Sequence, residues 1–273
     1  MKRKFKDRAL AASVWLAAGF TIFVMLFLIG YILVKGIPYV TPSLFAVQYT
    51  TENVSLLPAL ITTIMMVALS LAVAVPLGMF TAIYTVEYAS RGNRFVKLVR
   101  VMAETLSGIP SIVYGLFGLL FFVTWLGWGF SLLAGGFTLA IMILPLVMRT
   151  TEESLKSVPD TYREASYGLG AGRLRTVFRI VLPSAAPGIL AGVILGIGRI
   201  VGETAALIYT SGTVAKIPEN VLASGRTLAV HMYALSSEGL YTNQAYATAV
   251  VLLLVVIGIN TLSAMAAKRI VRV

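Results

Sequence analysis

The sequence predicts an all-α polytopic membrane protein with six transmembrane helices. Three observations support this prediction: an apolar composition, a series of long apolar runs, and an uneven distribution of positive charge. Of the 273 residues, 58% are hydrophobic and 12% are charged, and the mean hydropathy is +0.90. Soluble domains average about 45–50% apolar and about 25% charged residues, so this composition excludes a soluble globular enzyme and a disordered chain.

Six apolar runs are long enough to cross a membrane, because a helix needs about 20 residues to span roughly 30 Å of hydrocarbon. We expect spans at residues 11–34, 57–85, 102–126, 130–148, 186–208 and 245–267. The first run follows five basic residues, as in a secretory signal. It is too long for a cleaved signal, and we interpret it as a retained anchor. The chain then divides into an anchor region at 1–56, a core at 57–267 and a tail at 268–273.

Positive charge distinguishes the two sides of the membrane. If the N-terminus is cytoplasmic and the spans alternate, 18 of the 22 basic residues fall on cytoplasmic segments, as the positive-inside rule requires. Both termini and the loop at 150–183 are then cytoplasmic, and the loops at 35–56 and 209–244 are external. Topology therefore accounts for the net charge of +11, and we expect no nucleic-acid partner.

Residues that could build a catalytic or metal site are scarce. The chain has no cysteine and one histidine, His231, so a disulfide framework and a Cys/His zinc site are excluded. We interpret His231 as a loop residue. No Gly-x-x-x-x-Gly-Lys-Ser/Thr sequence is present to hold nucleotide phosphates. Glu152 and Glu153 are predicted to lie in a polar loop. We expect no catalytic residue, no metal and no cofactor, and ATP hydrolysis would need a separate chain.

A short helix is predicted in the cytoplasmic loop, at about residues 159–169. It follows a Ser-x-x-Asp start signal at Ser157 and ends in a run of glycines. Four of its residues have the i, i+3, i+4, i+7 spacing of a single helix face, namely Tyr162, Ala165, Ser166 and Leu169. The spacing alone leaves two alternatives open, a docking surface and a solvated loop.

A second amphipathic segment is predicted at residues 173–182, and Pro183 is expected to end it. Its apolar stripe would lie at the membrane surface, with Arg175 and Arg179 toward lipid phosphates. Membrane lipid is therefore an expected contact of this segment.

Arg199 and Glu203 are the only full charges predicted to lie deep within a span. A charge at bilayer depth costs at least about 2.5–3.5 kcal/mol, so such residues normally face protein or a water-filled path. A self-neutralising pair is the alternative, but glutamate after the cation is the weaker order on a helix. Because a guanidinium suits tetrahedral oxyanions, we expect Arg199 to be a way-station for an anion and Glu203 its gate. Thr204 follows in the same pathway.

Pro110 interrupts the third predicted span and frees backbone polar groups. Ser111 and Tyr114 are the neighbouring side chains with hydroxyl groups. They either satisfy the freed backbone groups or line the pathway, and the sequence leaves both interpretations open. Ser111 joins Arg199, Glu203 and Thr204 among the expected pathway residues.

Several motifs in the chain resemble a known family. The residues that match the EAA motif of ABC-importer permeases, with Ser166 where alanine is usual, are Glu164, Ala165, Ser166, Gly170, Ile180, Leu182 and Pro183. The stretches at 87–89, 108–116 and 199–205 are similar to phosphate-specific permeases, and 224–228 is similar to the PstA type. Ala206 departs from the proline that is usual at that position. The resemblance covers roughly residues 57–267.

This resemblance implies the architecture of a type I ABC-importer permease and a role in phosphate import. It implies that the short helix couples to an ATPase through Tyr162, Glu164, Ala165, Ser166, Leu169 and Gly170. The implied partners are a PstC-type second permease subunit, two ATP-binding subunits and an extracytoplasmic phosphate-binding protein, which would contact the loop at 209–244. The location would be a bacterial or archaeal cytoplasmic membrane.

The residues leave other functions open. Arg199 would serve any tetrahedral anion, so sulfate, molybdate and phosphonate remain alternative substrates. A membrane scaffold or sensor subunit without transport is a further alternative, and an intramembrane enzyme is the weakest one.

Overall fold

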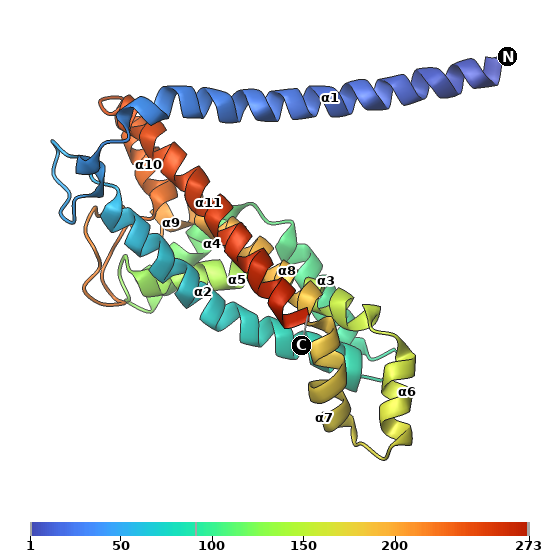
Figure 1. Ribbon diagram of the computed structural model, residues 1–273. Helices are drawn as coiled ribbons and strands as arrows, with labels where there is room; N and C mark the ends of the chain where they lie inside the picture. The colour runs from blue at the N-terminus through green and yellow to red at the C-terminus, as the bar shows by residue number, and fades with distance from the viewer. Residues whose placement is uncertain (1, 91, 272–273) are drawn as a thin grey trace.

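The computed structural model describes residues 2–90 and 92–271, and every regular element in this part of the chain is helical (Figure 1). Five helices are long and apolar enough to cross a membrane, and a sixth span results if one bent helix pair counts as a single crossing. The predicted all-α polytopic fold is therefore confirmed. The third and fifth spans differ in detail from the predicted ranges, as described below.

The helical elements, in chain order, are α1 (Lys2–Gly36), η1 (Ile37–Tyr39), η2 (Pro42–Phe45), α2 (Leu57–Ile83), η3 (Tyr84–Tyr88), α3 (Arg94–Ser107), α4 (Ser111–Gly118), η4 (Leu119–Trp125), α5 (Leu132–Ser157), α6 (Asp160–Gly168), α7 (Arg173–Thr176), η5 (Val177–Val181), α8 (Leu182–Val201), α9 (Ala205–Ile208), α10 (Leu228–Glu238) and α11 (Thr242–Val271). The helix α6 and the helix α10 lie at opposite ends of the bundle (Figure 1).

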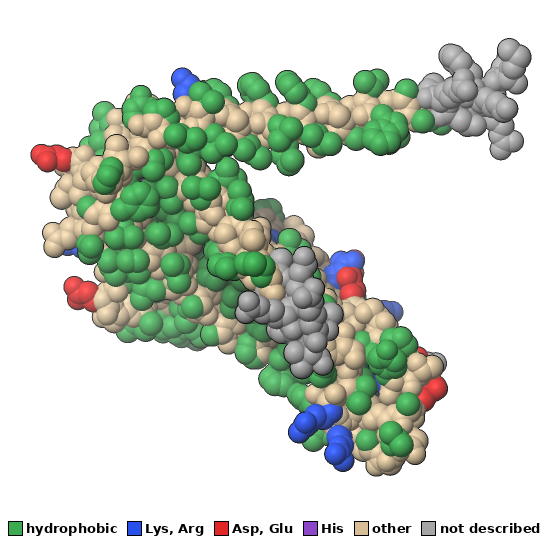
Figure 2. All heavy atoms as spheres, in the orientation of Figure 1, with side chains coloured by type: hydrophobic (Ala, Val, Ile, Leu, Met, Phe, Trp, Pro, Cys, Tyr) green, Lys and Arg blue, Asp and Glu red, His purple; other side chains and the backbone are tan. Residues whose placement is uncertain are grey.

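Helix α1 stands apart from the bundle (Figure 1). It meets the other helices near its C-terminal end, where the ring of Tyr31 packs edge-on against Tyr246 with 5.9 Å between the centroids. Gly36 allows this approach, because a Cβ there would collide with the backbone of Tyr246. Figure 2 shows hydrophobic side chains along α1 and the flank of the bundle, and charged side chains around α6. This distribution is typical of a chain whose flank faces lipid.

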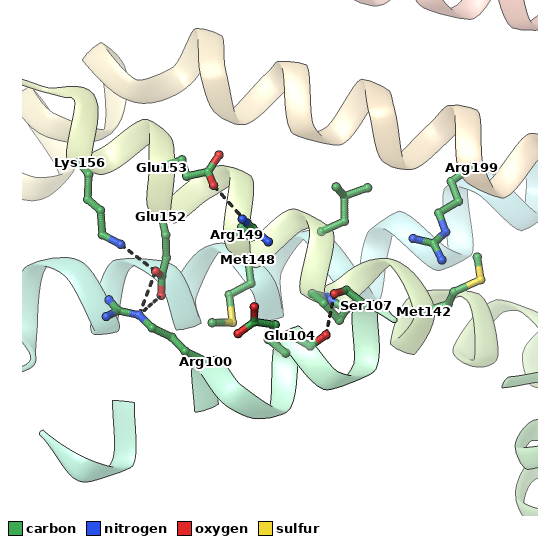
Figure 3. Close-up of a pocket in the computed structure, with 13 residues that line it drawn as sticks. Arg100, Glu104, Ser107, Met142, Met148, Arg149, Glu152, Glu153, Lys156 and Arg199 are labelled. Carbon is green, nitrogen blue, oxygen red and sulfur yellow. Dashed lines mark hydrogen bonds and ion pairs between the residues drawn. The ribbon is translucent and has the colours of Figure 1, made fainter. Parts of the chain in front are cut away.

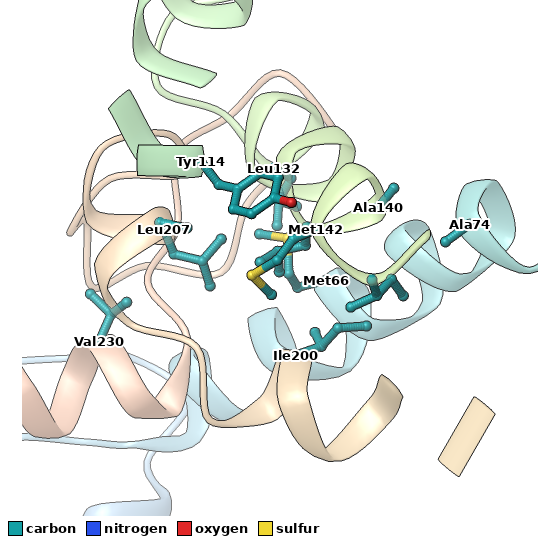
Figure 4. Packing of buried hydrophobic residues seen from close by; sticks show 12 residues of the cluster. Met66, Ala74, Tyr114, Leu132, Ala140, Met142, Ile200, Leu207 and Val230 are labelled. Atoms are coloured by element: carbon teal, nitrogen blue, oxygen red, sulfur yellow. The ribbon is translucent and has the colours of Figure 1, made fainter. Parts of the chain in front are cut away.

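Helix α5 is the centre of the bundle and packs between α2 and α8. Its core cluster draws side chains from several elements, including Met66 of α2, Tyr114 of α4, Met142, Ile200 of α8 and Leu207 of α9 (Figure 4). Close helix approach depends on small residues. A Cβ at Gly192 of α8, for example, would collide with the Thr150 side chain of α5. Gly188 and Gly192 of α8 therefore face α5 closely, as small residues in a membrane helix usually do.

The third predicted span is broken into two helices. The axes of α3 and α4 differ by 103° across the break at residues 108–110. Pro110 lacks a backbone N–H and disfavours the helical conformation of Ile109, which explains why the helix ends here. The hydroxyl of Tyr114 donates a hydrogen bond of 2.7 Å to the carbonyl of Leu106 across the break. Tyr114, rather than Ser111, thus satisfies a freed backbone group.

The fifth span begins and ends at other residues in the structure than the sequence predicts. A continuous helical rod runs from Arg173 to Val201, so the prediction that Pro183 ends a surface segment is wrong. Pro183 lies in the first turn of α8, directly after the π-helical turn η5, and a local π adjustment of this kind lets a membrane helix accommodate the missing N–H. The rod then ends at Val201, and residues 202–204 lie outside the helices. Glu203 and Arg199 therefore do not share a continuous helix.

Helix α5 extends nine residues beyond the predicted end of the fourth span, from residue 148 to Ser157. Glu152 and Glu153 consequently lie on a helix, and their prediction as loop residues is wrong. The apolar run ends at Arg149, but a helix continues past the apolar region wherever its polar side chains find partners. The short helix predicted at about 159–169 is confirmed as α6.

Candidate functional site

A pocket of about 390 Å³ lies between α3, α5 and the end of α8. It is unusually rich in charge for a membrane protein. Its charged lining residues are Arg100, Glu104, Arg149, Glu152, Glu153, Lys156 and Arg199. Arg199 and Lys156 lie at opposite ends of the group in the close-up view (Figure 3). The pocket therefore extends from the depth of Arg199 toward the α6 end.

Three of the four cations in this pocket are paired with a carboxylate. The pairs are Arg100 with Glu152 at 3.2 Å, Lys156 with Glu152 at 3.1 Å and Arg149 with Glu153 at 3.1 Å (Figure 3). Arg199 forms no ion pair within the described residues. The guanidinium of Arg199 is thus the cation of this pocket whose charge is left for another anion.

Glu152 holds the wall of the pocket together. Glu152 is buried, and its carboxylate accepts a hydrogen bond of 2.6 Å from the Thr85 hydroxyl of η3 as well as bonds from Arg100 and Lys156. Charge-assisted hydrogen bonds of this kind are about twice as strong as neutral ones. Glu152 therefore connects η3, α3 and α5 at the α6 end of the pocket.

Glu203 lies in the non-helical residues 202–204 that follow α8, and its role as a gate stays a prediction. It is buried beyond the end of α8, and its Oε1 accepts a hydrogen bond of 3.1 Å from the amide of Ala206. The carboxylate thereby caps the first turn of α9. No ion pair joins Glu203 to Arg199 in the described part of the chain. The pocket that holds Arg199 is lined by neither Ser111, Glu203 nor Thr204.

The residues that do accompany Arg199 were not singled out from the sequence. Arg100 and Glu104 lie on α3, and Arg149 and Lys156 lie on α5. Their charged character was visible, but they lie at helix ends where contact with lipid headgroups was the simpler interpretation. Only the packing of α3 against α5 brings them to the pocket.

A second pocket, of about 450 Å³, lies along α6. Five of the six residues expected to couple to an ATPase line it, namely Tyr162, Ala165, Ser166, Leu169 and Gly170. Glu164 is exposed beside it. The spacing argument for one shared helix face is therefore confirmed by the geometry.

Arg175 and Arg179 line the same pocket on its opposite wall. Both side chains are exposed on this wall, and their expected contact with lipid phosphates stays a prediction. The hydroxyls of Ser166 and Thr176 are hydrogen bonded at 2.8 Å and buried between the two walls. Serine at the motif position where alanine is usual thus fastens α6 to α7.

Arg163 attaches α6 to the rest of the bundle. Its guanidinium donates hydrogen bonds to the carbonyls of Val158 at 2.8 Å and of Leu155 at 2.9 Å, at the end of α5. It also hydrogen bonds Glu87, and this bond raises the pKa of Arg163 above its ordinary value. The guanidinium is therefore a permanent cation whose N–H groups are hydrogen bonded to fixed partners.

Comparison with known proteins agrees with this architecture. A family model described as "Binding-protein-dependent transport system inner membrane component" matches residues 74–272. The probable ABC transporter permease protein YqgI of Bacillus subtilis is 33% identical, over 88% of this chain and 86% of that protein. The phosphate transport system permease protein PstA of Haemophilus influenzae is 31% identical, over 94% of this chain and 92% of that protein. PstA of Mycobacterium leprae is 46% identical, over 51% of this chain and 45% of that protein.

Solved structures share the fold. One chain of a bacterial alginate ABC transporter, crystallised with an alginate-bound periplasmic protein, gives a TM-score of 0.71 at 17% identity, covering 97% of this chain and 96% of that one. A chain of the inward-facing MetNI methionine transporter gives 0.62 at 18% identity, covering 78% and 93%. The resemblance to PstA-type permeases and the expected ABC-importer permease fold are both confirmed. The chain therefore belongs to the family of binding-protein-dependent transport system inner membrane components, and PstA phosphate permeases are among its relatives.

Proposed function

We propose that this chain is a permease subunit that forms half of the translocation pathway of an ATP-driven importer of inorganic phosphate. The observation that carries the proposal is Arg199, the cation left unpaired in a pocket whose other cations are held by carboxylates. A guanidinium offers a planar fork of N–H donors that matches a tetrahedral oxyanion. Phosphate is the anion in the names of the PstA relatives, and we extend it to this chain.

The pocket supports a route from Arg199 toward the α6 end. Arg100, Arg149 and Lys156 lie along this route. Together with Arg199 these cations exceed by one the three carboxylates of the pocket, Glu104, Glu152 and Glu153, so the net charge of the pocket is positive. A phosphate released from Arg199 would pass these cations while their own carboxylates prevent tight binding. The anion can leave each position only if no cation there binds it tightly.

We place the α6 end of the molecule in the cytoplasm and the α10 end outside. The distribution of basic residues supports this orientation and places both termini in the cytoplasm. Residues 1–56 then form the anchor region, 57–267 the permease core and 268–273 a cytoplasmic tail. The membrane is the cytoplasmic membrane of a bacterium or an archaeon.

We propose different partners for the α6 end and the α10 end of the bundle. The face of α6 with Tyr162 and Leu169 would dock one of two ATP-binding subunits, and a PstC-type permease would complete the pathway. A phosphate-binding protein would contact residues 209–244. Closure of the ATPase pair would move α6 and switch the pocket between two openings, which requires two states that nucleotide and substrate bias differently.

Reconstitution tests this proposal. The chain, a PstC-type subunit, the ATPase and the binding protein are placed in proteoliposomes, and uptake of radiolabelled phosphate is measured with and without a tenfold excess of sulfate. We expect ATP-dependent phosphate uptake that sulfate does not reduce. Uptake that sulfate suppresses would indicate a general oxyanion permease, and no uptake by a fully assembled complex would indicate a scaffold or sensor.

A further inference from the structure

Buried side-chain atoms without a hydrogen-bond partner are concentrated at the start of α10. Seven such nitrogen or oxygen atoms occur among the described residues, and five of them belong to three residues. These five are Nε and Nη2 of Arg226, Oγ1 of Thr227, and Nδ1 and Nε2 of His231. Buried polar groups in proteins are nearly always hydrogen bonded. A cluster of this kind therefore requires an occupant that supplies the missing partners.

Arg226 gives the cluster its charge. The residue is 6% exposed, and no carboxylate lies within ion-pair distance of it in the part of the chain that the structure describes. Its Cζ lies 4.7 Å from the centroid of the Tyr49 ring, which covers one face of the guanidinium. The ring leaves the donors at the edge of the guanidinium free. Because an unpaired buried charge is strongly unfavourable, these donors favour an anion.

His231 and the N-terminus of α10 add neutral polar groups to the cluster around Arg226. Burial, and then the charge of Arg226, lower the pKa of His231 to about 3, and an interaction with the backbone of Val54, too long or bent for a regular hydrogen bond, opposes this shift only in part. The imidazole therefore adds no second cation at neutral pH. Thr227 precedes α10, an 11-residue helix. The amide of Leu228 is bonded to the Thr63 hydroxyl at 2.9 Å, but the next two amides lie in the first turn, where no intrahelical acceptor exists. Such termini bind oxyanions.

A strained turn closes the cluster. Tyr49 covers Arg226 and also packs edge-on against His231, with 6.1 Å between ring centroids. The same turn contains Val54, the non-glycine residue with a positive φ, +46°, among the described residues. This conformation is an outlier for a β-branched residue and is kept only where the surroundings enforce it. The segment over the cluster therefore stores strain that a second arrangement would release.

We propose that Arg226, Thr227 and His231 form an oxyanion site, closed by residues 49–55, that takes inorganic phosphate before it reaches Arg199. The position of this site on the outer side rests on the proposed function. A carboxylate of the binding protein would have the same chemistry as phosphate. The enclosure favours free phosphate over a carboxylate of the binding protein. The unpartnered donors have no exposed surface, and a carboxylate side chain could reach them only if the backbone that carries it entered as well.

Hydrogen exchange of the assembled importer in nanodiscs, without binding protein, tests the site. Inorganic phosphate is compared with chloride at equal ionic strength. We expect phosphate to slow amide exchange at least threefold in residues 49–55 and in the first turn of α10. Arg226→Gln should abolish this protection and Thr227→Val should weaken it. Lys216→Gln is the matched control, because it removes an exposed cation from the same loop and should leave the protection unchanged.

Two outcomes overturn the site. Equal exchange in phosphate and chloride would mean that water alone fills the cluster. Protection that appears only when phosphate-free binding protein is added would assign the cluster to a carboxylate of that protein. These results are independent of uptake. If the wild-type complex transports no phosphate, the proposed function fails, whereas the exchange experiment still decides whether the site exists.

Thermal unfolding separates a ligand site from a structural arginine. In phosphate-free buffer, Arg226→Gln should unfold at a higher temperature than the wild type, because it removes an unpaired buried charge. The same variant should lose at least tenfold in phosphate uptake, and Lys216→Gln should lose less than twofold. A lower unfolding temperature for Arg226→Gln would show that the guanidinium is satisfied within the fold, and the proposal would be wrong.

Discussion

Arg163 and Glu87 form an ion pair of 2.7 Å that joins α6 to η3, at the end of the span that begins with α2. Both side chains are largely removed from solvent, and the same guanidinium binds two carbonyls at the end of α5. The helix that we propose to meet the ATPase is therefore attached directly to two spans of the core. A displacement of α6 has to move α2 and α5 or break this pair.

Glu87→Gln should uncouple ATP hydrolysis from transport. The variant removes the buried carboxylate partner of Arg163, which keeps only the exposed Asp160 and two carbonyls, and loss of a hydrogen bond to a charged group costs about 1.5–3 kcal/mol of unfolding free energy. We expect a lower unfolding temperature and fewer phosphates transported per ATP hydrolysed. Asp160→Asn is the matched control, since Asp160 binds the same Arg163 at 3.1 Å but is 86% exposed. Exposed pairs contribute about 0–1 kcal/mol. Identical behaviour of the two variants would contradict the role of the Glu87 pair.

Arg199→Lys should reduce phosphate uptake at least about tenfold, because hydrogen bonds to charged groups contribute about 1.5–3 kcal/mol and the lysine lacks the planar fork. The measurement is initial uptake in proteoliposomes at equal amounts of assembled complex. Arg149→Lys is the control, because Arg149 lines the same pocket but is exposed and already paired with Glu153. It should stay within twofold of the wild type. Near-normal uptake by Arg199→Lys would remove the claim of planar oxyanion contact.

Leu169→Asp should prevent binding of the ATPase without destabilising the permease. Leu169 is 90% exposed on the pocket face of α6, so a charge there costs the fold little but opposes an apolar contact. Co-purification of the ATPase with the permease measures the effect. Tyr167→Asp places the same charge on the opposite face of α6 and should retain the ATPase. If both variants keep the ATPase, the pocket face is not the docking surface.

Ser166→Ala should cost about 1 kcal/mol of unfolding free energy, because the hydroxyl of Thr176 loses its buried partner. Transport per ATP should stay unchanged, since alanine is the usual residue of the motif at this position. Thermal unfolding and uptake of the same preparation check both parts. A loss of coupling without a loss of stability would mean that Ser166 touches the ATPase directly.

The stability of the protein should depend on pH through His231. Its pKa falls from 6.5 to about 3 on folding, so between these values the unfolded state binds more protons than the folded state. The contribution of this group to the free energy of unfolding is therefore full above pH 6.5 and decreases as the pH falls toward 3, by about 5 kcal/mol in total. Arg226 and Tyr49 are the groups that face the ring.

His231→Asn isolates this contribution, because the variant keeps a polar side chain that does not titrate. We expect the unfolding temperature of the wild type to fall more steeply between pH 7 and pH 5 than that of His231→Asn. Equal slopes would show that His231 is not held neutral. Phosphate-free buffer is required, so that occupation of the α10 cluster does not enter the comparison.

The sequence alone determined the membrane class, the approximate spans, the short helix α6 and the family resemblance. These properties depend on local signals. Hydropathy over about 20 residues identifies a span, and the start signal at Ser157 and the glycines after α6 define that helix. The same local reasoning was wrong at Pro183 and Gly202, where a proline was tolerated in a first turn and a helix ended inside an apolar run.

Only the tertiary structure decided which charges are paired. Glu152 binds Thr85, 67 residues away, and Arg163 binds Glu87, 76 residues away. Spacing along one helix suggested Arg199 with Glu203, but the helix ends between them and each meets a different surrounding. Arg226 likewise looked like an ordinary loop cation until the turn at Tyr49 was found to bury it. Ion pairs and burial depend on how distant helices pack, and hydropathy and periodicity within one segment do not contain that information.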